Sequence, residues 1–257
     1  MAIITLSRKT FSGTRELAGH VAETLGYRLV SRDDIIEKTA QCGMSGDRQD
    51  RARRRRLGML QRVDLGWVHY LVFTRAALTK EIRQGSLIYL GGNGPALFKD
   101  FPNVLNVAVV ADMDYRIDRL LRRTDYVINR KKARRIIEDM DEKEARWRKA
   151  LHVSYSREDG LDGLLEPGLV IEQGLVSPPE ACELIRATLE GPQYQTTYKS
   201  LETIDILTAA AELRARIAMN EDVVDDNVDV TVQDGMIVVS GSVRSTEDWE
   251  SIKELLD

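Results

Sequence analysis

Residues 2–31 read AIITLSRKTFSGTRELAGHVAETLGYRLVS, and this stretch decides the fold class. A β-branched apolar run leads into a short segment around Gly13, after which apolar residues recur at helical spacing until Gly26. Strand, loop and helix in this order are typical of a phosphate-binding loop, because glycine lets the backbone approach a phosphate and the helix N-terminus supplies amides. The usual G-x-x-x-x-G-K-[ST] signature is incomplete, since no Lys-Ser/Thr pair follows Gly13.

The rest of the chain repeats the alternation of strand and helix. Apolar runs of strand length lie near residues 2–6, 87–90, 104–110 and 169–172, and helical segments lie at about 33–84 and 114–150. Strands separated by helices imply right-handed crossovers and a parallel sheet covered on both faces. We therefore expect an α/β nucleotide-binding architecture.

The C-terminal part reads as a separate module. The polar stretch PQYQTTYKS is typical of a linker, and a helix near residues 203–218 follows it. The string VDVTVQDGMIVVSGSV contains two alternating runs divided by Asp234-Gly235, which predicts a tight hairpin because both turn positions need positive φ. A last helix is expected from about Ser245 to Leu256. The predicted organisation is a nucleotide-binding domain at 1–191, a linker at 192–202 and a small α/β domain at 203–257.

Charge is divided unevenly between these parts. The 257 residues carry a formal net charge of −4, but residues 203–257 hold 13 acidic and 4 basic residues. The remaining residues are mildly basic, so two modules with different partners are indicated. Cys42 and Cys182 are too few and too far apart for a disulfide framework, and no segment has the apolar length of a membrane span. We expect a soluble, cytoplasmic protein.

Several other features have simpler interpretations than a site. The run DRQDRARRRRLGMLQRV indicates a solvated helix face or a phosphate contact, and the acidic chain and lack of interleaved aromatics argue against a nucleic-acid partner. The stretch GWVHYLVF indicates a buried helix face, in the core or at a dimer interface. Three histidines are scattered, and Asp225, Asp226 and Asp229 lack calcium-loop spacing. We therefore expect no metal site built by the protein alone.

Several strings resemble the cytidylate kinase-like family, a branch of the nucleoside monophosphate kinases. The family loop typically reads S-R-x-x-G-S-G-G-R-E, and the residues that match it are Ser7, Arg8, Ser12, Gly13, Arg15 and Glu16. The resemblance continues in SLIYLGGNGPALFKDFPNVLNVAVVADMDYRIDRLLRR, in DEKEARW and in LVIEQGLVSPPEACELI. The tail from Leu207 resembles a BON domain, a small module associated with phospholipid surfaces or small ligands.

The resemblance implies a P-loop kinase fold and a kinase that uses ATP with Mg²⁺ on a pyrimidine nucleoside monophosphate, CMP by family analogy. Residues implied at the donor nucleotide are Ser7, Arg8, Ser12, Gly13, Thr14, Glu16, Arg116 and Arg119. Those implied at the acceptor are Arg32, Asp33 and Asp34. Catalytic charge would come from Arg15, Arg122, Arg130, Arg134, Asp141 and Arg146, with Arg122, Arg123, Arg130 and Arg134 on a lid that closes over the phosphates.

Four positions depart from the family pattern. Phe11 and Thr14 replace loop glycines, Gly92 replaces a basic residue or histidine, and Glu144 replaces the arginine of an Asp-x-x-Arg motif. Arg146 either substitutes for that arginine or forms a surface pair with Asp141. Two hypotheses follow: an active kinase, or a weakened nucleotide-sensing module whose BON-like tail engages a lipid surface, a ligand or a protein partner.

Overall fold

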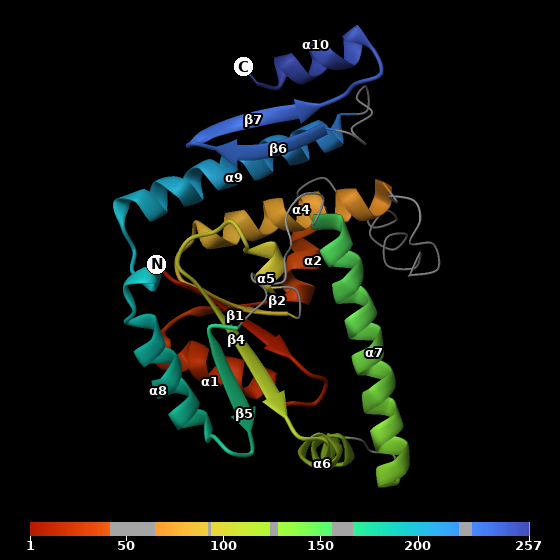
Figure 1. Ribbon diagram of the computed structural model, residues 1–257, viewed down its shortest axis with the longest axis vertical. Coiled ribbons are helices and arrows are strands. Elements are labelled where there is room, and N and C mark those ends of the chain that lie inside the picture. Colours follow the sequence, from red (N-terminus) through yellow and green to blue (C-terminus); the bar gives the residue numbers. More distant parts are fainter. Residues whose placement is uncertain (42–64, 92–93, 124–127, 156–166, 221–227, 257) are drawn as a thin grey trace. The chain divides into compact units, whose positions relative to one another are not determined.

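The computed structural model describes residues 1–41, 65–91, 94–123, 128–155, 167–220 and 228–256 (Figure 1). Its contacts group the chain into two compact units. The first unit comprises Met1–Arg32, Gly85–Lys99 and Asn103–Thr196, and the second comprises Asp33–Gln84, Asp100–Pro102 and Thr197–Asp257. The division proposed from the sequence follows sequence modules rather than contacts, and it stays a prediction.

The first unit contains a five-stranded sheet with flanking helices. Its elements are β1 (Ile3–Arg8), α1 (Thr14–Leu25), β2 (Arg28–Ser31), β3 (Leu87–Leu90), α5 (Gly94–Leu97), β4 (Val104–Ala111), α6 (Met113–Arg123), α7 (Arg130–Tyr155), β5 (Leu169–Gln173), α8 (Pro178–Leu189) and the 3₁₀ turn η1 (Pro192–Tyr194). The strand order is β2-β3-β1-β4-β5, and every pair is parallel. In the central register Ile3 lies opposite Leu87 on β3 and Val104 on β4. The predicted parallel α/β architecture is confirmed.

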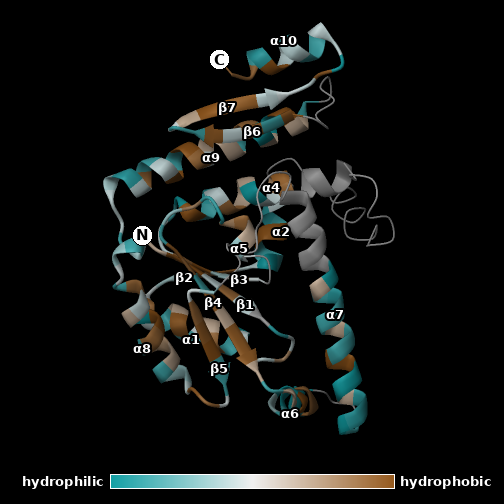
Figure 2. Ribbon diagram, in the orientation of Figure 1, coloured by the Kyte–Doolittle hydropathy of each residue, from teal (hydrophilic) through white to brown (hydrophobic). Residues whose placement is uncertain are grey.

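The sheet is apolar along its strands, as the brown ribbons of Figure 2 show. Its main core combines Ile4 and Val107 from the strands with Leu17 and Val21 from α1 and Ile185 from α8, all of them buried. These side chains recur every three or four residues on the two helices and every second residue along the strands, which is the period that each element requires. Helices α1 and α8 pack together and cover this face of the sheet.

Three elements differ from the expectation. Strand β2 lies between the first helix and the helical insertion, and it escaped prediction because only Leu29 and Val30 in it are strongly apolar. The helical region expected at 114–150 consists of two helices, α6 and α7. Helix α9 (Tyr198–Met219) begins inside the polar stretch read as a linker, because the Thr197 side chain accepts a bond from Ser200 N and caps it.

The second unit combines the helical insertion with the C-terminal module. It contains α2 (Arg32–Gln41) from Asp33 onward, α4 (Leu65–Ile82), α9, β6 (Val228–Gln233), β7 (Met236–Gly241) and α10 (Thr246–Glu254). Helix α9 runs along α4 and carries the hairpin on its C-terminal part. Asp234 and Gly235 have φ values of 49° and 75°, so the predicted hairpin turn is confirmed.

A small core holds the C-terminal module together. Ile217, Val228 and Ile252 are buried there. On α4, Leu71 and Phe73 are buried as expected, whereas the side chains of Trp67 and Tyr70 and the arginine run lie outside the described residues. No helix in the described part of the chain is long and apolar enough to cross a membrane.

Candidate functional site

The loop of residues 9–13 joins β1 to α1 at the carboxyl edge of the sheet, where parallel α/β folds bind ligands. It turns tightly, with Ser12 N donating to Lys9 O at 3.1 Å. Phe11 and Gly13 both have left-handed backbones, with φ values of 60° and 80°. Gly13 is the N-cap of α1 and offers no side-chain cap, so the first amides at the positive end of this helix have no side-chain acceptor and are suited to an anion.

Two hydroxyl groups stiffen the loop from inside. Ser12 and Thr14 are both 1% exposed, and their side-chain oxygens lie 2.7 Å apart. Thr14 replaces a family glycine, yet its side chain is turned into the protein rather than toward the mouth of the loop. The side chain that replaces the glycine is therefore buried against Ser12.

Gly13 is required both by its backbone and by its surroundings. A Cβ added there would lie 3.1 Å from Gln173 Oε1 and 3.4 Å from both Arg119 Cζ and Tyr115 Oη. Gln173 ends β5, and its side chain is buried with 7% exposure. Among the described residues no group accepts a bond from Gln173 Nε2. An unpaired buried amide is costly, so this donor beside the loop is suited to a ligand oxygen or ring nitrogen.

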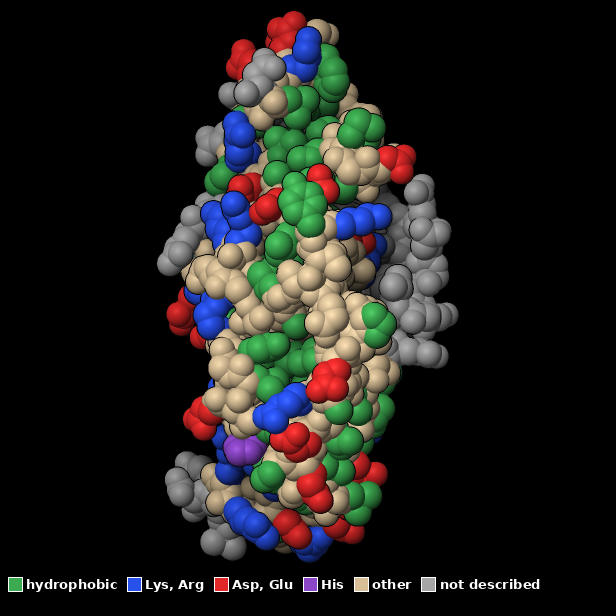
Figure 3. Space-filling view, turned by 90° about the vertical axis from the view of Figure 1, so that its left-hand side faces the viewer, with side chains coloured by type: hydrophobic (Ala, Val, Ile, Leu, Met, Phe, Trp, Pro, Cys, Tyr) green, Lys and Arg blue, Asp and Glu red, His purple; other side chains and the backbone are tan. Residues whose placement is uncertain are grey.

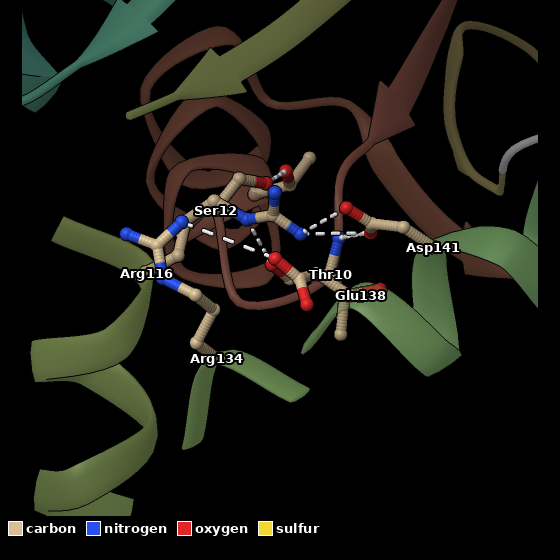
Figure 4. A network of polar contacts seen from close by, with 7 residues as sticks. Thr10, Ser12, Arg116, Arg134, Glu138 and Asp141 are labelled. Carbon is tan, nitrogen blue, oxygen red and sulfur yellow. Dashed lines mark hydrogen bonds and ion pairs between the residues drawn. The ribbon is translucent and has the colours of Figure 1, made fainter. Parts of the chain in front are cut away.

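Thr10 is held from two helices at once, as Figure 4 shows. Arg116 on α6 donates from Nε to Thr10 O at 2.7 Å and from Nη2 to both oxygens of Asp141 at 2.7 and 2.6 Å. Asp141 on α7 in turn accepts from Thr10 N at 3.3 Å. The Arg116 side chain is 4% exposed, so its guanidinium is buried between the Asp141 carboxylate and the backbone carbonyl of Thr10.

Arg119 is an implied donor-site cation that lies beside Gly13. It pairs with Glu16 on the first turn of α1, Nη2 to Oε1 at 2.6 Å, and lies 5.8 Å from the centre of the Tyr115 ring. Both partners of the ion pair are partly exposed, so a phosphate could compete with Glu16 for the guanidinium. Arg119 thus lies where the loop, α6 and the end of β5 meet.

Most of the remaining arginines named from the sequence lie on the surface of α6 and α7, the two helices that the family resemblance implies as a lid and that are called the lid helices below, whereas Arg15 lies on α1. Arg130 bonds Asp118 and, at 2.7 Å, Asp114, and these hydrogen bonds, first that to Asp118, raise the pKa of Arg130. Arg134 lies 3.9 Å from Glu138, a pair also drawn in Figure 4. Arg15 and Arg122 are exposed and form no ion pair within the described residues. Exposed pairs of this kind are weak, so phosphates could displace these carboxylates.

The expected alternative of a surface pair between Asp141 and Arg146 is wrong. Asp141 pairs with Arg116, whereas Arg146 pairs with Glu142 one turn earlier on α7. Residues five apart on a helix point in different directions, while residues four apart are neighbours. Glu144, the family departure at this motif, is half-buried on the same helix.

Comparison with known proteins places this site in a family. A model of the cytidylate kinase-like family matches residues 3–159, which include the β1–α1 loop and both lid helices. The chain belongs to the cytidylate kinase-like family. A model of the BON domain matches residues 205–257, so the C-terminal region is BON-like. No curated protein matches the chain.

Solved structures agree with the fold of this kinase-like chain. An uncharacterized protein from Eubacterium ventriosum is 17% identical, with a TM-score of 0.53 over 74% of this chain and 98% of that one. Shikimate kinase from Bacteroides thetaiotaomicron is 14% identical over 74% of this chain and 99% of that one, with a TM-score of 0.43. The first likeness supports the fold, and the second is too distant to carry an argument.

The acceptor residues implied by the kinase-like family lie at the start of α2. Arg32 is the last residue of its segment in the first unit, and Asp33 and Asp34 are exposed residues of the second. Ser7 is the second-last residue of β1, and its hydroxyl donates to Val107 O at 3.4 Å. The side chain of Arg8 and the whole of Gly92 lie outside the described residues. The roles of all these residues stay predictions.

The family also implies Mg²⁺ carried with ATP. Within the described ranges no three His, Cys, Asp or Glu residues form a group that could hold a metal. Mg²⁺ in kinases is usually held by substrate phosphates, waters and one or two carboxylates. Glu16 is the carboxylate on the first turn after the loop, so the described residues fit this mode.

Sequence reasoning missed three contributors: Gln173, Tyr115 and the anchoring of Phe11. Gln173 could have been found from its place at the end of a predicted strand of the same sheet as the strand that carries the loop.

A separate groove of about 790 Å³ lies between α1 and α8, lined by residues that include His20, Thr24 and Cys182. Figure 3 shows this side of the first unit, where apolar side chains lie among charged ones. The groove is lined by the later turns of α1, whereas the loop precedes the first turn of that helix.

Proposed function

We propose that this protein is a nucleoside monophosphate kinase that transfers the γ-phosphate of ATP to a pyrimidine nucleoside monophosphate, CMP by family analogy. The observation that carries the proposal is the meeting, at Gly13, of the uncapped end of α1 with the unpaired amide of Gln173 and the Arg119 guanidinium. Aligned amides suit phosphate oxygens, and a buried amide donor suits a heterocyclic base or a sugar.

The loop, the lid helices and the start of α2 each have a role in this proposal. Helix α1 and its loop bind the donor phosphates, with Arg15 and Arg119 supplying positive charge. Arg122, Arg130, Arg134 and Arg146 on the lid helices neutralise the charge that develops during transfer. For Arg130, Arg134 and Arg146 the phosphates first replace the carboxylate partners. Bound Mg²⁺, held by the phosphates and Glu16, would supply further neutralisation. Arg32, Asp33 and Asp34 orient the acceptor.

A second function is favoured by a different observation. Arg116, Arg119, Arg130, Arg134 and Arg146 all pair with carboxylates. A site whose cations are already neutralised can bind a nucleotide with little transition-state stabilisation. The protein would then sense a nucleotide in the cytoplasm, while the BON-like module engages a lipid surface, a small ligand or a protein partner.

A screen of acceptors separates the two functions. Purified protein is incubated with ATP, Mg²⁺ and, in turn, CMP, UMP, dCMP and AMP, and ADP formation is followed with ATP alone as the blank. The kinase proposal expects ADP formation that depends on both Mg²⁺ and a pyrimidine monophosphate. Calorimetric binding of ATP without ADP formation from any acceptor supports the sensing function instead. Absence of ATP binding contradicts both.

A further inference from the structure

Phe11 occupies a backbone conformation that glycine normally supplies. Its φ of 60° is strained for a residue with a side chain. Such a conformation persists where the surroundings fix it. The side chain of Phe11 is half-buried and packs against a cluster of four buried residues on the lid helices, Ile117, Leu120, Ala133 and Ile137. The bulk that replaces the glycine is therefore placed against α6 and α7.

The residue before it is attached to the same two helices by polar groups. Thr10 O accepts from Arg116 on α6, and Thr10 N donates to Asp141 on α7 (Figure 4). Arg116 and Asp141 also bond each other. Two consecutive loop residues thus contact both lid helices, one by apolar packing and one by hydrogen bonds.

We propose that Phe11 and Asp141 are positioning residues, which hold the β1–α1 loop against the lid helices before a nucleotide binds. This inference rests on the proposed kinase function and assigns to Asp141 a role through the loop rather than at the reacting atoms. A loop fixed in advance loses less conformational entropy when it binds phosphates. Anchoring by Phe11 thereby replaces the adaptability that a glycine-rich loop provides.

Phe11 could obstruct the loop instead of anchoring it, and the two interpretations predict opposite changes in nucleotide affinity for Phe11→Gly. If the side chain only obstructs the loop, restoring the family glycine strengthens nucleotide binding. If it anchors the loop, Phe11→Gly weakens binding of Mg²⁺-ATP by about tenfold, a change of about 1.4 kcal/mol. Phe11→Leu keeps an apolar anchor, so its affinity for Mg²⁺-ATP should stay within about threefold of the native value.

Calorimetry of Mg²⁺-ATP measures these affinities, with Met236→Ala on the exposed hairpin as a control that changes nothing. Thermal melts confirm that every variant is folded at the temperature of the titration. In an active protein, Phe11→Gly raises the KM for ATP and leaves the KM for CMP unchanged, which a general loss of stability would not do. Equal or tighter ATP binding by Phe11→Gly overturns the proposal.

Hydrogen exchange of the nucleotide-free protein tests the anchoring without relying on any activity. The proposal expects Phe11→Gly and Asp141→Ala each to speed exchange in both the loop and the facing part of α7. Asp141→Asn retains an acceptor for Thr10 N and Arg116, so it restores most of the protection. Faster exchange in the loop alone, or in neither segment, overturns the inference even if the protein binds ATP. Coupled exchange supports it even if no ADP forms.

Discussion

Arg116 and Asp141 form a two-point ion pair between helices α6 and α7, with Nη2 2.7 and 2.6 Å from the two carboxylate oxygens, and both residues bond the backbone of Thr10. The guanidinium is almost fully buried, while 32% of the Asp141 side chain is exposed. This pair joins the site's loop to its lid helices. Its energetic and functional consequences can be measured separately.

Removing the carboxylate of this pair will destabilise the fold. Asp141→Ala leaves a buried guanidinium without its counter-ion, and we expect a loss of about 2 to 3 kcal/mol in the free energy of unfolding, below the range for a fully buried pair because Asp141 is partly exposed. Glu138→Ala, one turn earlier on α7, removes an exposed partner of Arg134 and is expected to cost less than about 0.5 kcal/mol. Urea unfolding measures both, and equal losses would contradict the structural account of the pair.

Replacing Gly13 and Gly19 with alanine should change the stability of the protein in opposite directions. Gly13→Ala places a Cβ at φ +80° and 3.1 Å from Gln173, so we expect it to destabilise the protein by about 1 to 2 kcal/mol and to abolish nucleotide binding. Gly19 lies inside α1 with no atom within 4 Å of an added Cβ. Gly19→Ala should stabilise by about 0.5 to 1 kcal/mol. Thermal unfolding and ATP titration of the two variants provide the comparison.

Replacing Gln173 with leucine is expected to stabilise the fold and to weaken ATP binding. Gln173→Leu removes a buried amide that lacks a partner, so the free energy of unfolding should rise by about 1 kcal/mol. The same change removes a buried amide donor beside the loop, and ATP affinity should fall by about tenfold, or about 1.4 kcal/mol. The exposed Gln193→Leu is the control and should alter neither quantity. A Gln173→Leu protein that binds ATP normally would show that this amide does not face the ligand.

The cap of α8 should give a local pH dependence. Hydrogen bonds from the Ser177 side chain and backbone lower the pKa of Glu180. A carboxyl group whose folded pKa is depressed adds stability above its unfolded pKa, about 4.3, and loses it as the pH falls through the folded value. The difference in unfolding free energy between native protein and Glu180→Gln should therefore be present at pH 7 and shrink as the pH falls below about 4.3, disappearing once the pH passes the depressed folded pKa. A difference independent of pH would contradict this role.

The sequence predicted the fold where local patterns are strong and failed where they are weak. Continuous apolar runs and the Asp234-Gly235 turn indicated the strands and the hairpin correctly. Strand β2 has only two strongly apolar residues, and its pairing with β3 depends on residues far away in the chain. The start of α9 was misjudged because the capping pair of Thr197 and Ser200 lies within an otherwise polar stretch.

The candidate site was predictable only in part for a similar reason. Gly13 and the helix after it were visible in the first thirty residues. The partner of Asp141 was not, because Arg116 lies 25 residues earlier and is brought near by packing of α6 on α7. The sequence showed Phe11 only as a replacement of a family glycine, because the direction of its side chain depends on the apolar cluster of the lid helices. Gln173 became a candidate only when its unpaired amide was seen beside Gly13.

The most direct test of the kinase proposal is identification of the transfer product. Protein, Mg²⁺, ATP and CMP are incubated together, and phosphorus NMR follows the nucleotides over time. We predict equal amounts of CDP and ADP, formed only when both Mg²⁺ and CMP are present and lost in Arg15→Ala. Intact ATP and CMP after prolonged incubation with folded protein would contradict the account.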